Sequence, residues 1–272
     1  MKANKWTAVL LTAALTLSLA GCGSQKSGPV KEGSIVVGAS PSPHAEILEA
    51  VSDQLAEQGY TLEITEFTDY VMPNTALEEG ELDANFFQHK PYLDDFNEKN
   101  GTHLTSAAAI HFEPLGIYGG KTADLSQLAD GAQIAVPNDT TNEARALQLL
   151  QAQGIIEIDP DAGLEATKQD ITANPHNVEI VEMEAAQLPR TLSDVDFAVI
   201  NGNYAVAAGI ADQVLVSEEK TSEAAQQYAN IVAVREGDED REDIQALIKA
   251  LQSDEVREFI EETYGNTVVP VF

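Results

Sequence analysis

Cysteine is almost absent from this chain of 272 residues, and Cys22 is its only example. A single thiol excludes an intrachain disulfide and argues against redox chemistry. Positive charge is also scarce, because 15 lysines and arginines stand against 45 acidic residues, which gives a formal net charge of −30. The acidic residues are spread along the chain and are typical of a solvated surface. Such a surface excludes nucleic acid as a partner, since binding to phosphates requires clustered cationic side chains.

Motifs of catalysis are absent as well. The chain has no Gly-x-Ser-x-Gly elbow and no phosphate-binding loop, so we expect no enzymatic activity and no cofactor. Its 5 histidines have none of the close spacings of a preformed metal site. One alternative stays open, which is a zinc site assembled in space from His44, His89, His111 and a carboxylate.

The first residues have the pattern of an export signal. Two lysines precede an apolar run from Ala8 to Ala20, which is too short for the ~20 apolar residues of a membrane-spanning helix. Small residues then lead directly into Cys22, as in the bacterial lipobox. We therefore predict a signal peptide over residues 1–21, lipid attachment at Cys22 and a flexible tether over residues 22–33. The folded part would then be anchored to the cell membrane on its extracytoplasmic side.

Aromatic residues make up only 6 % of the chain, yet they gather between residues 67 and 93. The candidates for a pocket in this stretch are Phe67, Tyr70, Phe87, His89 and Tyr92. Each one taken singly is most simply a core residue, because aromatic side chains dominate core packing. Tyrosine and histidine, however, combine an apolar ring with a hydrogen-bonding tip. In a strand over residues 85–89, alternation places Phe87 and His89 on one face, so that one face can pack in the core and the other can line a pocket.

Strand and helix signals alternate through the folded part, which predicts an α/β protein with mainly parallel sheets. Two extended stretches, residues 103–119 and 228–235, lack a helical period and separate two such clusters. We therefore expect two lobes, one formed by residues 34–115 plus 231–272 and the other by residues 116–230. Ligands of open α/β sheets bind in crevices, so a cleft between the lobes is the expected site.

A helix start near Thr140 offers the groups for a carboxylate site. Thr140 and Glu143 have the spacing of a capping box. Asn142 and Arg145 are three residues apart and therefore lie on one face of the first turns. A guanidinium, an amide and free backbone N–H groups at the positive end of a helix suit a small carboxylate. An ordinary surface arginine fits the same spacing equally well.

Several long segments together resemble the NlpA family of lipoproteins. They are Phe67-Thr-Asp-Tyr-Val-Met-Pro-Asn, Asp83-Ala-Asn-Phe-Phe-Gln-His-Lys-Pro-Tyr-Leu, His111-Phe-Glu-Pro-Leu-Gly-Ile-Tyr, Val136-Pro-Asn-Asp-Thr-Thr-Asn and Leu188-Pro-Arg-Thr-Leu. The resemblance implies a two-lobed periplasmic-binding-protein fold of the type 2 kind, which delivers one amino acid to the permease and ATPase of an ABC importer. It implies methionine as the solute, with L-methionine, D-methionine and a methionine-containing dipeptide all left open.

The resemblance also implies roles for single residues. The five aromatic-stretch candidates would surround the methionine side chain, whose sulfur gains about 0.3–1.5 kcal/mol from aromatic contacts. Arg145 with Asn142 would hold the carboxylate, and Asn201 and Asn230 would bind the amine and the carboxylate from the second lobe and the crossing strand. Glu113 would either pair with the ammonium or line the cleft mouth. The alternatives are a zinc or other metal-ion receptor of an ABC importer, an extracytoplasmic enzyme acting on small amino-acid derivatives, and a surface adhesin.

Overall fold

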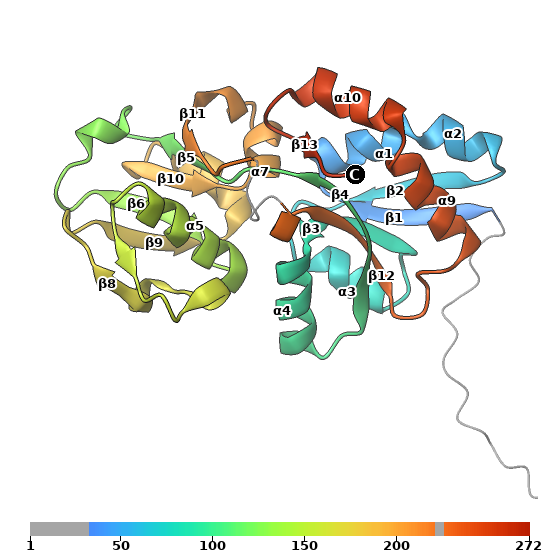
Figure 1. Cartoon of the computed structure of the whole chain (residues 1–272), viewed down its shortest axis with the longest axis horizontal. Helices are drawn as coiled ribbons and strands as arrows, with labels where there is room; N and C mark the ends of the chain where they lie inside the picture. The colour runs from blue at the N-terminus through green and yellow to red at the C-terminus, as the bar shows by residue number, and fades with distance from the viewer. Residues whose placement is uncertain (1–32, 221–225) are drawn as a thin grey trace, which may run out of the picture.

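The computed structural model describes residues 33–220 and 226–272. The predicted signal peptide, Cys22 and all but the last residue of the predicted tether lie outside these residues. Figure 1 shows two lobes side by side, joined by extended segments that pass between them. The two-lobed α/β fold expected from the sequence is thereby confirmed.

The elements alternate along the chain as expected. The strands are β1 Ser34–Ala39, β2 Thr61–Glu66, β3 Ala84–His89, β4 Leu104–Phe112, β5 Gly116–Gly119, β6 Gln133–Pro137, β7 Glu157–Ile158, β8 Ile171–Ala173, β9 Glu179–Met183, β10 Phe197–Ile200, β11 Val214–Ser217, β12 Asn230–Arg235 and β13 Val269–Pro270. The helices are α1 Glu46–Ala50, α2 Ser52–Glu57, α3 Met72–Glu78, α4 Lys90–Asn100, α5 Thr140–Ala152, α6 Leu188–Thr191, α7 Gly202–Ala207, α9 Glu242–Leu251 and α10 Asp254–Tyr264. In the described part of the chain, no helix is both long enough and apolar enough to cross a membrane.

The first lobe is built on a six-stranded sheet with the order β13-β4-β12-β3-β1-β2. Alternation along β1 sends Ile35 and Val37 to one face, where they pack with residues of α1, α2, α9 and α10, including Leu247. Val36 points to the opposite face and packs with Leu77 of α3. Helices therefore cover both faces of this sheet, and its core is buried between them (Figure 1).

The second lobe is built on a five-stranded sheet with the order β11-β5-β10-β6-β9. β6 pairs in parallel with β9 and β10, whereas β5 pairs antiparallel with β10 and β11. In the first lobe β1 pairs in parallel with β2 and β3, whereas β12 runs antiparallel to β3 and β4. The expectation of mainly parallel sheets is therefore wrong. Every antiparallel pair in these two sheets includes β4, β5 or β12, the strands next to the crossings between lobes.

The crossings place two candidate residues between the sheets. β4 belongs to the first sheet and β5 to the second, and Glu113 is the residue that directly follows β4. Asn230 is the first residue of β12, which brings the chain back into the first sheet. We keep the lobe limits at residues 115 and 230 as a proposal.

The first helical segment begins later than the sequence suggests. Ser42-Pro43 has the sequence pattern of an N-cap followed by proline at the first helical position, which predicts a helix start at Pro43. The backbone of Ser42 is extended instead, with φ −138° and ψ 140°, and it lies inside a short irregular turn over Pro41–Ala45. The regular helix α1 starts at Glu46. The turn has a consequence for the site, because it buries His44 completely.

Helix α5 starts where expected but with a different cap. The N-cap is Asp139, whose carboxylate accepts from the backbone N–H of Asn142 at 3.1 Å. The carboxylate of Glu143 accepts from the backbone N–H of Lys168 at 2.9 Å, so it does not reach back to the helix start. The predicted capping box is therefore wrong, although the aspartate satisfies one of the orphan donors of the first turn in its place.

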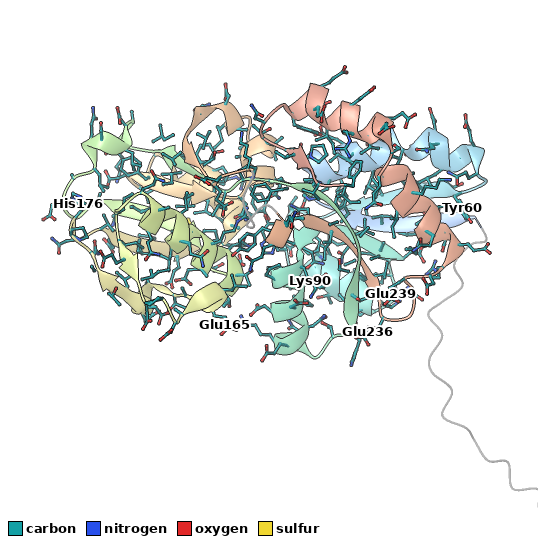
Figure 2. The ribbon with its side chains drawn as sticks, viewed as in Figure 1. Tyr60, Lys90, Glu165, His176, Glu236 and Glu239 are labelled. Carbon is teal, nitrogen blue, oxygen red and sulfur yellow. The ribbon has the colours of Figure 1, made fainter. Side chains whose placement is uncertain are left out.

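The acidic excess appears on the surface of both lobes. Glu165 in the second lobe and Glu236 in the first are exposed, and Figure 2 shows both at the outside of the molecule. These carboxylates are solvated, as expected for a charge coat.

Candidate ligand-binding pocket

A pocket lies between the two lobes and encloses about 340 Å³ of space, part of which is open to solvent. The residues that line it are Tyr70, Phe87, Gln88, His89, Tyr92, Glu113, Asn142, Arg145, Asn201, Gly202, Asn203 and Asn230. Small-molecule sites are concave and combine apolar walls with a few convergent polar groups, and the lining of this pocket has both. All the residues predicted to bind ligand line it, with the exception of Phe67.

Phe67 belongs to the core of the first lobe. It directly follows β2, and its backbone N–H donates to the carbonyl of Ala39 at 2.9 Å. Its side chain is half buried and packs with Leu77 and Leu82. Its ring also lies so close to Gly38 that a Cβ there would meet it at 3.0 Å. Because the sheet holds the backbone of Phe67, the structure does not bring this residue to the pocket.

Three aromatic residues, Tyr70, Phe87 and Tyr92, form one side of the pocket, which we call the aromatic wall. The ring centroids of Tyr70 lie 5.8 Å from those of both Phe87 and Tyr92, and Phe87 and Tyr92 are 6.1 Å apart. The Tyr92 hydroxyl donates to the backbone carbonyl of Tyr70 at 2.9 Å. These tilted and edge-on contacts are the geometries that aromatic rings favour. The wall therefore offers a rigid apolar surface to a ligand side chain.

His89 connects the aromatic wall to the second lobe. Its Nδ1 accepts from the backbone N–H of Tyr92 at 3.1 Å, which caps α4. The ring proton is therefore on Nε2, which donates to Oδ1 of Asn142 at 3.2 Å. Burial, together with the charge of Arg145, lowers the pKa of His89 to about 3, so the ring is neutral.

Asn142 and Asn201 place an acceptor in the pocket. Oδ1 of Asn142 accepts from Nδ2 of Asn201 at 2.9 Å, and this bond fixes the orientation of the Asn201 amide. Oδ1 of Asn201 is buried and has no hydrogen-bond partner among the described residues. A buried acceptor without a partner is costly, so Asn201 is well suited to receive a donor from a ligand.

Arg145 is buried at the pocket wall, where it forms an ion pair that the sequence does not indicate. Its Nε donates to Oε1 of Glu218 at 2.7 Å, and its Nη2 donates to Oε2 of Glu218 at 2.5 Å. Nη2 also donates to the backbone carbonyl of Glu113 at 2.8 Å. The guanidinium lies over the ring of Tyr228, 4.6 Å from its centroid. Burial alone would lower the pKa of Arg145, but the pair with Glu218 outweighs it and the pKa is raised.

One terminal nitrogen of Arg145 is left over by these contacts. The described residues provide no acceptor for Nη1. Arg145 lines the pocket, so its guanidinium can still donate to a ligand carboxylate while Glu218 holds it in place.

Glu113 is an acidic residue of the pocket lining and is only 4 % exposed, so it does not lie at a solvated mouth. Its Oε1 lies 2.6 Å from Nε2 of His111 and 3.3 Å from Nε2 of His44. Burial raises the pKa of Glu113, although His44, Arg145 and the backbone N–H of Asn203 partly offset this. An acidic group with few cations beside it suits a ligand that carries a positive charge.

Gly202 allows α7 to approach Glu113. A Cβ at residue 202 would lie 2.7 Å from Cβ of Glu113 and 3.0 Å from its Oε2. Real Cβ atoms do not come so close to another side chain, so only glycine fits here. The approach brings the second lobe directly against the residue that follows β4.

Two tyrosines join the lobes beside the pocket. The hydroxyl of Tyr70 donates to Oδ1 of Asn203 at 2.6 Å, and the hydroxyl of Tyr204 donates to the carbonyl of Thr68 at 3.2 Å. Their rings are also in contact, with centroids 5.0 Å apart. The lobes are therefore in contact across the pocket.

The set of residues predicted from the sequence to bind ligand leaves out four residues of this site, which are Gln88, Gly202, Asn203 and Glu218. Asn203 and Gly202 belong to an Asn-Gly-Asn segment after a buried strand, a pattern that signals a turn before it signals a pocket. Gln88 is held by Asn74, which donates to its Oε1 at 2.8 Å and accepts from its Nε2 at 2.6 Å. Nothing in the local sequence around Glu218 marks it as the partner of Arg145.

The structure brings His44, His111 and Glu113 together but leaves His89 apart. One ligand atom from each of the first three lies within 4.8 Å of the others. Nδ1 of His44 and of His111, however, has no partner among the described residues. Metal-bound histidines almost always donate from their other ring nitrogen, so the fit to zinc is poor. The four-ligand zinc site considered from sequence is not assembled here.

Fold and pocket together define a class. Two α/β lobes enclose a small pocket with an aromatic wall, a paired guanidinium and an acidic group, which is the construction of a two-lobed solute-binding protein. The chain belongs to the NlpA lipoprotein family, whose match spans residues 35–272.

Individual relatives cover nearly all of the chain. It is 39 % identical over 274 residues to the membrane lipoprotein TpN32 of Treponema pallidum, with 99 % of each chain covered. It is 41 % identical over 260 residues to the D-methionine-binding lipoprotein MetQ of Salmonella typhimurium, with 93 % of each covered. The structure of a nutrient binding protein from Burkholderia cenocepacia bound to methionine is similar, with a TM-score of 0.83 and 44 % identity. That match covers 88 % of this chain and 100 % of the other.

Proposed function

We propose that this chain is an extracytoplasmic, lipid-anchored solute-binding protein that captures methionine and delivers it to the permease of an ABC importer. The observation that carries the proposal is that Phe87 and Arg145 line the same small pocket from different lobes. An apolar side chain and an α-carboxylate can then be bound at once. The methionine named for a relative and for a solved structure supports the choice of solute.

The polar groups suit the two charged ends of an amino acid. Arg145 would donate to the carboxylate, assisted by the amides of Asn142 and Asn230. Glu113 and the unpaired Oδ1 of Asn201 would accept from the ammonium. The aromatic wall would pack against the thioether, for which sulfur–aromatic contacts contribute about 0.3–1.5 kcal/mol. Since the lobes are in contact across the pocket, they would have to separate to admit the solute.

A catalytic role has less support. Among the described residues that line the pocket there is no serine, threonine, cysteine or lysine to act as a nucleophile. Recovery of chemically unchanged ligand after prolonged incubation would agree with binding alone. A metal-receptor role is disfavoured by the unpartnered Nδ1 atoms of His44 and His111.

The test is native mass spectrometry of protein purified without added ligand, followed by calorimetric titration of ligand-free protein. We expect bound methionine or, after its removal, tight binding of L-methionine, D-methionine or a methionine-containing dipeptide, which the titration would rank. If an unrelated amino acid bound tenfold more tightly than all three, the assignment of methionine would be wrong.

A further inference from the structure

Two histidines outside the pocket lining converge on one carboxylate oxygen. His44 comes from the turn before α1 and His111 from β4, and both are completely buried. Nε2 of His111 lies 2.6 Å from Oε1 of Glu113, and Nε2 of His44 lies 3.3 Å from the same atom. Both rings pack against Phe86, with centroids 5.2 Å and 4.7 Å from it. The rings are therefore fixed in orientation by the core of the first lobe.

The unpartnered ring nitrogens decide where the protons are. A proton on Nδ1 of either ring would be a buried N–H without an acceptor among the described residues. An orphaned buried donor is rarely tolerated, so each neutral ring carries its proton on Nε2. Burial is the main cause that lowers the pKa of His44 to about 4 and of His111 to about 3, which agrees with neutral rings.

Two Nε2–H groups directed at one oxygen require that oxygen to be an acceptor. Oε1 of Glu113 receives the short bond from His111 and shares His44 with Oδ1 of Asn230, which lies 3.1 Å from the His44 nitrogen. Burial raises the pKa of Glu113, but a proton on Oε1 would put a third hydrogen into this cluster, so the two N–H donors oppose the effect of burial. The geometry therefore favours the ionised carboxylate.

The negative charge of Glu113 has no full partner in the pocket. Arg145 is the nearest guanidinium, but Glu218 holds it through two hydrogen bonds. Oε2 of Glu113 faces the position of Gly202, which lines the pocket. A cationic group of the solute is what would complete this arrangement.

We propose that His44 and His111 are positioning residues that hold Glu113 as a carboxylate, so that the pocket requires a free ammonium group on its solute. This inference rests on the proposed function and defines its substrate class. Amino acids and peptides with an unblocked amine bind, whereas N-acylated and des-amino analogues are excluded, because they leave a buried carboxylate unpaired.

The first experiment is a calorimetric comparison of L-methionine with 4-(methylthio)butanoate, which lacks only the amine. We expect the protein to prefer methionine at least a hundredfold. In His111→Leu and His44→Leu this preference should shrink at least tenfold. The affinity for methionine should fall, whereas the affinity for 4-(methylthio)butanoate should not. His111→Gln and His44→Gln place an amide donor near the Nε2 position and should restore most of it.

Two controls separate a specific role from a structural one. His176 is exposed, so His176→Leu should leave the preference unchanged. In a Glu113→Gln background, His111→Leu should have no further effect on the preference, since the charge that it positions is already gone. The proposal would be overturned if His111→Leu lowered the affinity for both ligands equally. It would also be overturned if His111→Leu reduced the preference for methionine as much in the Glu113→Gln background as in the unaltered protein.

A measurement without ligand gives an independent test. Long-range ¹H–¹⁵N spectra of histidine-labelled protein near neutral pH should show His44 and His111 as neutral rings protonated on Nε2, in addition to His89. An Nδ1 proton or an imidazolium at His44 or His111 overturns the inference. So does tight zinc binding that His111→Leu abolishes. Absence of methionine binding to the unaltered protein would instead refute the proposed function itself, so the two failures can be told apart.

Discussion

Arg145 and Glu218 form a two-point ion pair at the pocket wall, although 73 residues separate them in the chain. The pair fixes the plane of the guanidinium and leaves Nη1 for a ligand. It also means that Arg145 contributes to folding as well as to binding, because its loss would strand a buried carboxylate.

Replacement of Arg145 by alanine should weaken methionine binding by about 3–5 kcal/mol, since a buried ligand carboxylate would lose its partner. The melting temperature should fall as well, because Glu218 would be left unpaired. Calorimetry and thermal unfolding measure the two effects separately. Arg190 is exposed, so Arg190→Ala serves as the control and should change neither. A loss of less than tenfold in affinity would remove Arg145 from the site.

Glu218→Gln tests whether Glu218 contributes to stability, to methionine binding or to both. The amide keeps one hydrogen bond to Arg145 but removes the neutralising charge. We expect lower stability together with unchanged or tighter methionine binding, because the guanidinium is then freer to pair with the ligand. A parallel drop in stability and affinity would show that Glu218 acts only by holding the lobe together.

The aromatic wall should recognise shape more than chemistry. A methylene is worth only about 1–3 kcal/mol in an apolar pocket, so norleucine and selenomethionine should compete with methionine. Alanine and aspartate should not, because the first leaves the wall unfilled and the second buries a charge against Phe87. Competition against labelled methionine measures this. Rejection of norleucine by more than a thousandfold would imply a specific group for sulfur that the pocket does not contain.

The buried histidines predict the response of stability to acid. The native pKa values of His44 and His111 are about 4 and about 3, below the ordinary value of 6.5. Below pH 6.5 the unfolded chain takes up protons that the folded chain cannot, so the free energy of unfolding should fall between pH about 6.5 and about 4. This contribution is present in full above pH 6.5.

Glu143 acts in the opposite direction, because burial raises its pKa to about 7 and the folded chain then binds its proton first. The contribution of His111 is isolated by comparing the parent protein with His111→Gln. The free energy of unfolding of both proteins is measured by urea unfolding at each pH. The variant should lose less stability on acidification. An equal slope for the two proteins would contradict the assignment of His111 as buried and neutral.

Gly202→Ala should damage binding more than folding. The added methyl group would lie 2.7 Å from Cβ of Glu113, so α7 must move away from the crossing between lobes. The control is Gly119→Ala, whose Cβ would meet the carbonyl of Thr122 at 2.9 Å, away from the pocket. We expect the first variant to lose methionine affinity at least tenfold and the second to lose stability alone. The reverse result would show that α7 does not need to approach Glu113.

Much of the site was predictable from sequence because its residues lie in short, ordered segments. Phe87 and His89 are two residues apart in one strand and therefore share a face, and Asn142 and Arg145 lie on one face of the first turns of a helix. Local periodicity therefore already pairs them. The same reasoning could not separate Phe67 from Tyr70. The two residues are close in sequence, and the sequence does not show that Phe67 packs in the core of the first lobe while Tyr70 lines the pocket.

Long-range features were beyond such patterns. The pairing of Arg145 with Glu218 depends on how the strand before residue 218 enters the second sheet, and nothing local encodes that. The mixed pairing of the sheets has the same origin. Alternating strands and helices predict the elements, but the directions of β5 and β12 follow from the two crossings between lobes.

The hydrogen bonds from Tyr70 to Asn203 and from Tyr204 to Thr68 bear on kinetics. Both bonds join the lobes beside the pocket, so a solute released by separation of the lobes leaves only after both have broken. Its residence time would then be set by that separation more than by the contacts inside the pocket. Phenylalanine at either position should then shorten the dwell time without altering which solutes fit. A transporter that breaks these two hydrogen bonds would speed release of the solute without contacting the solute itself.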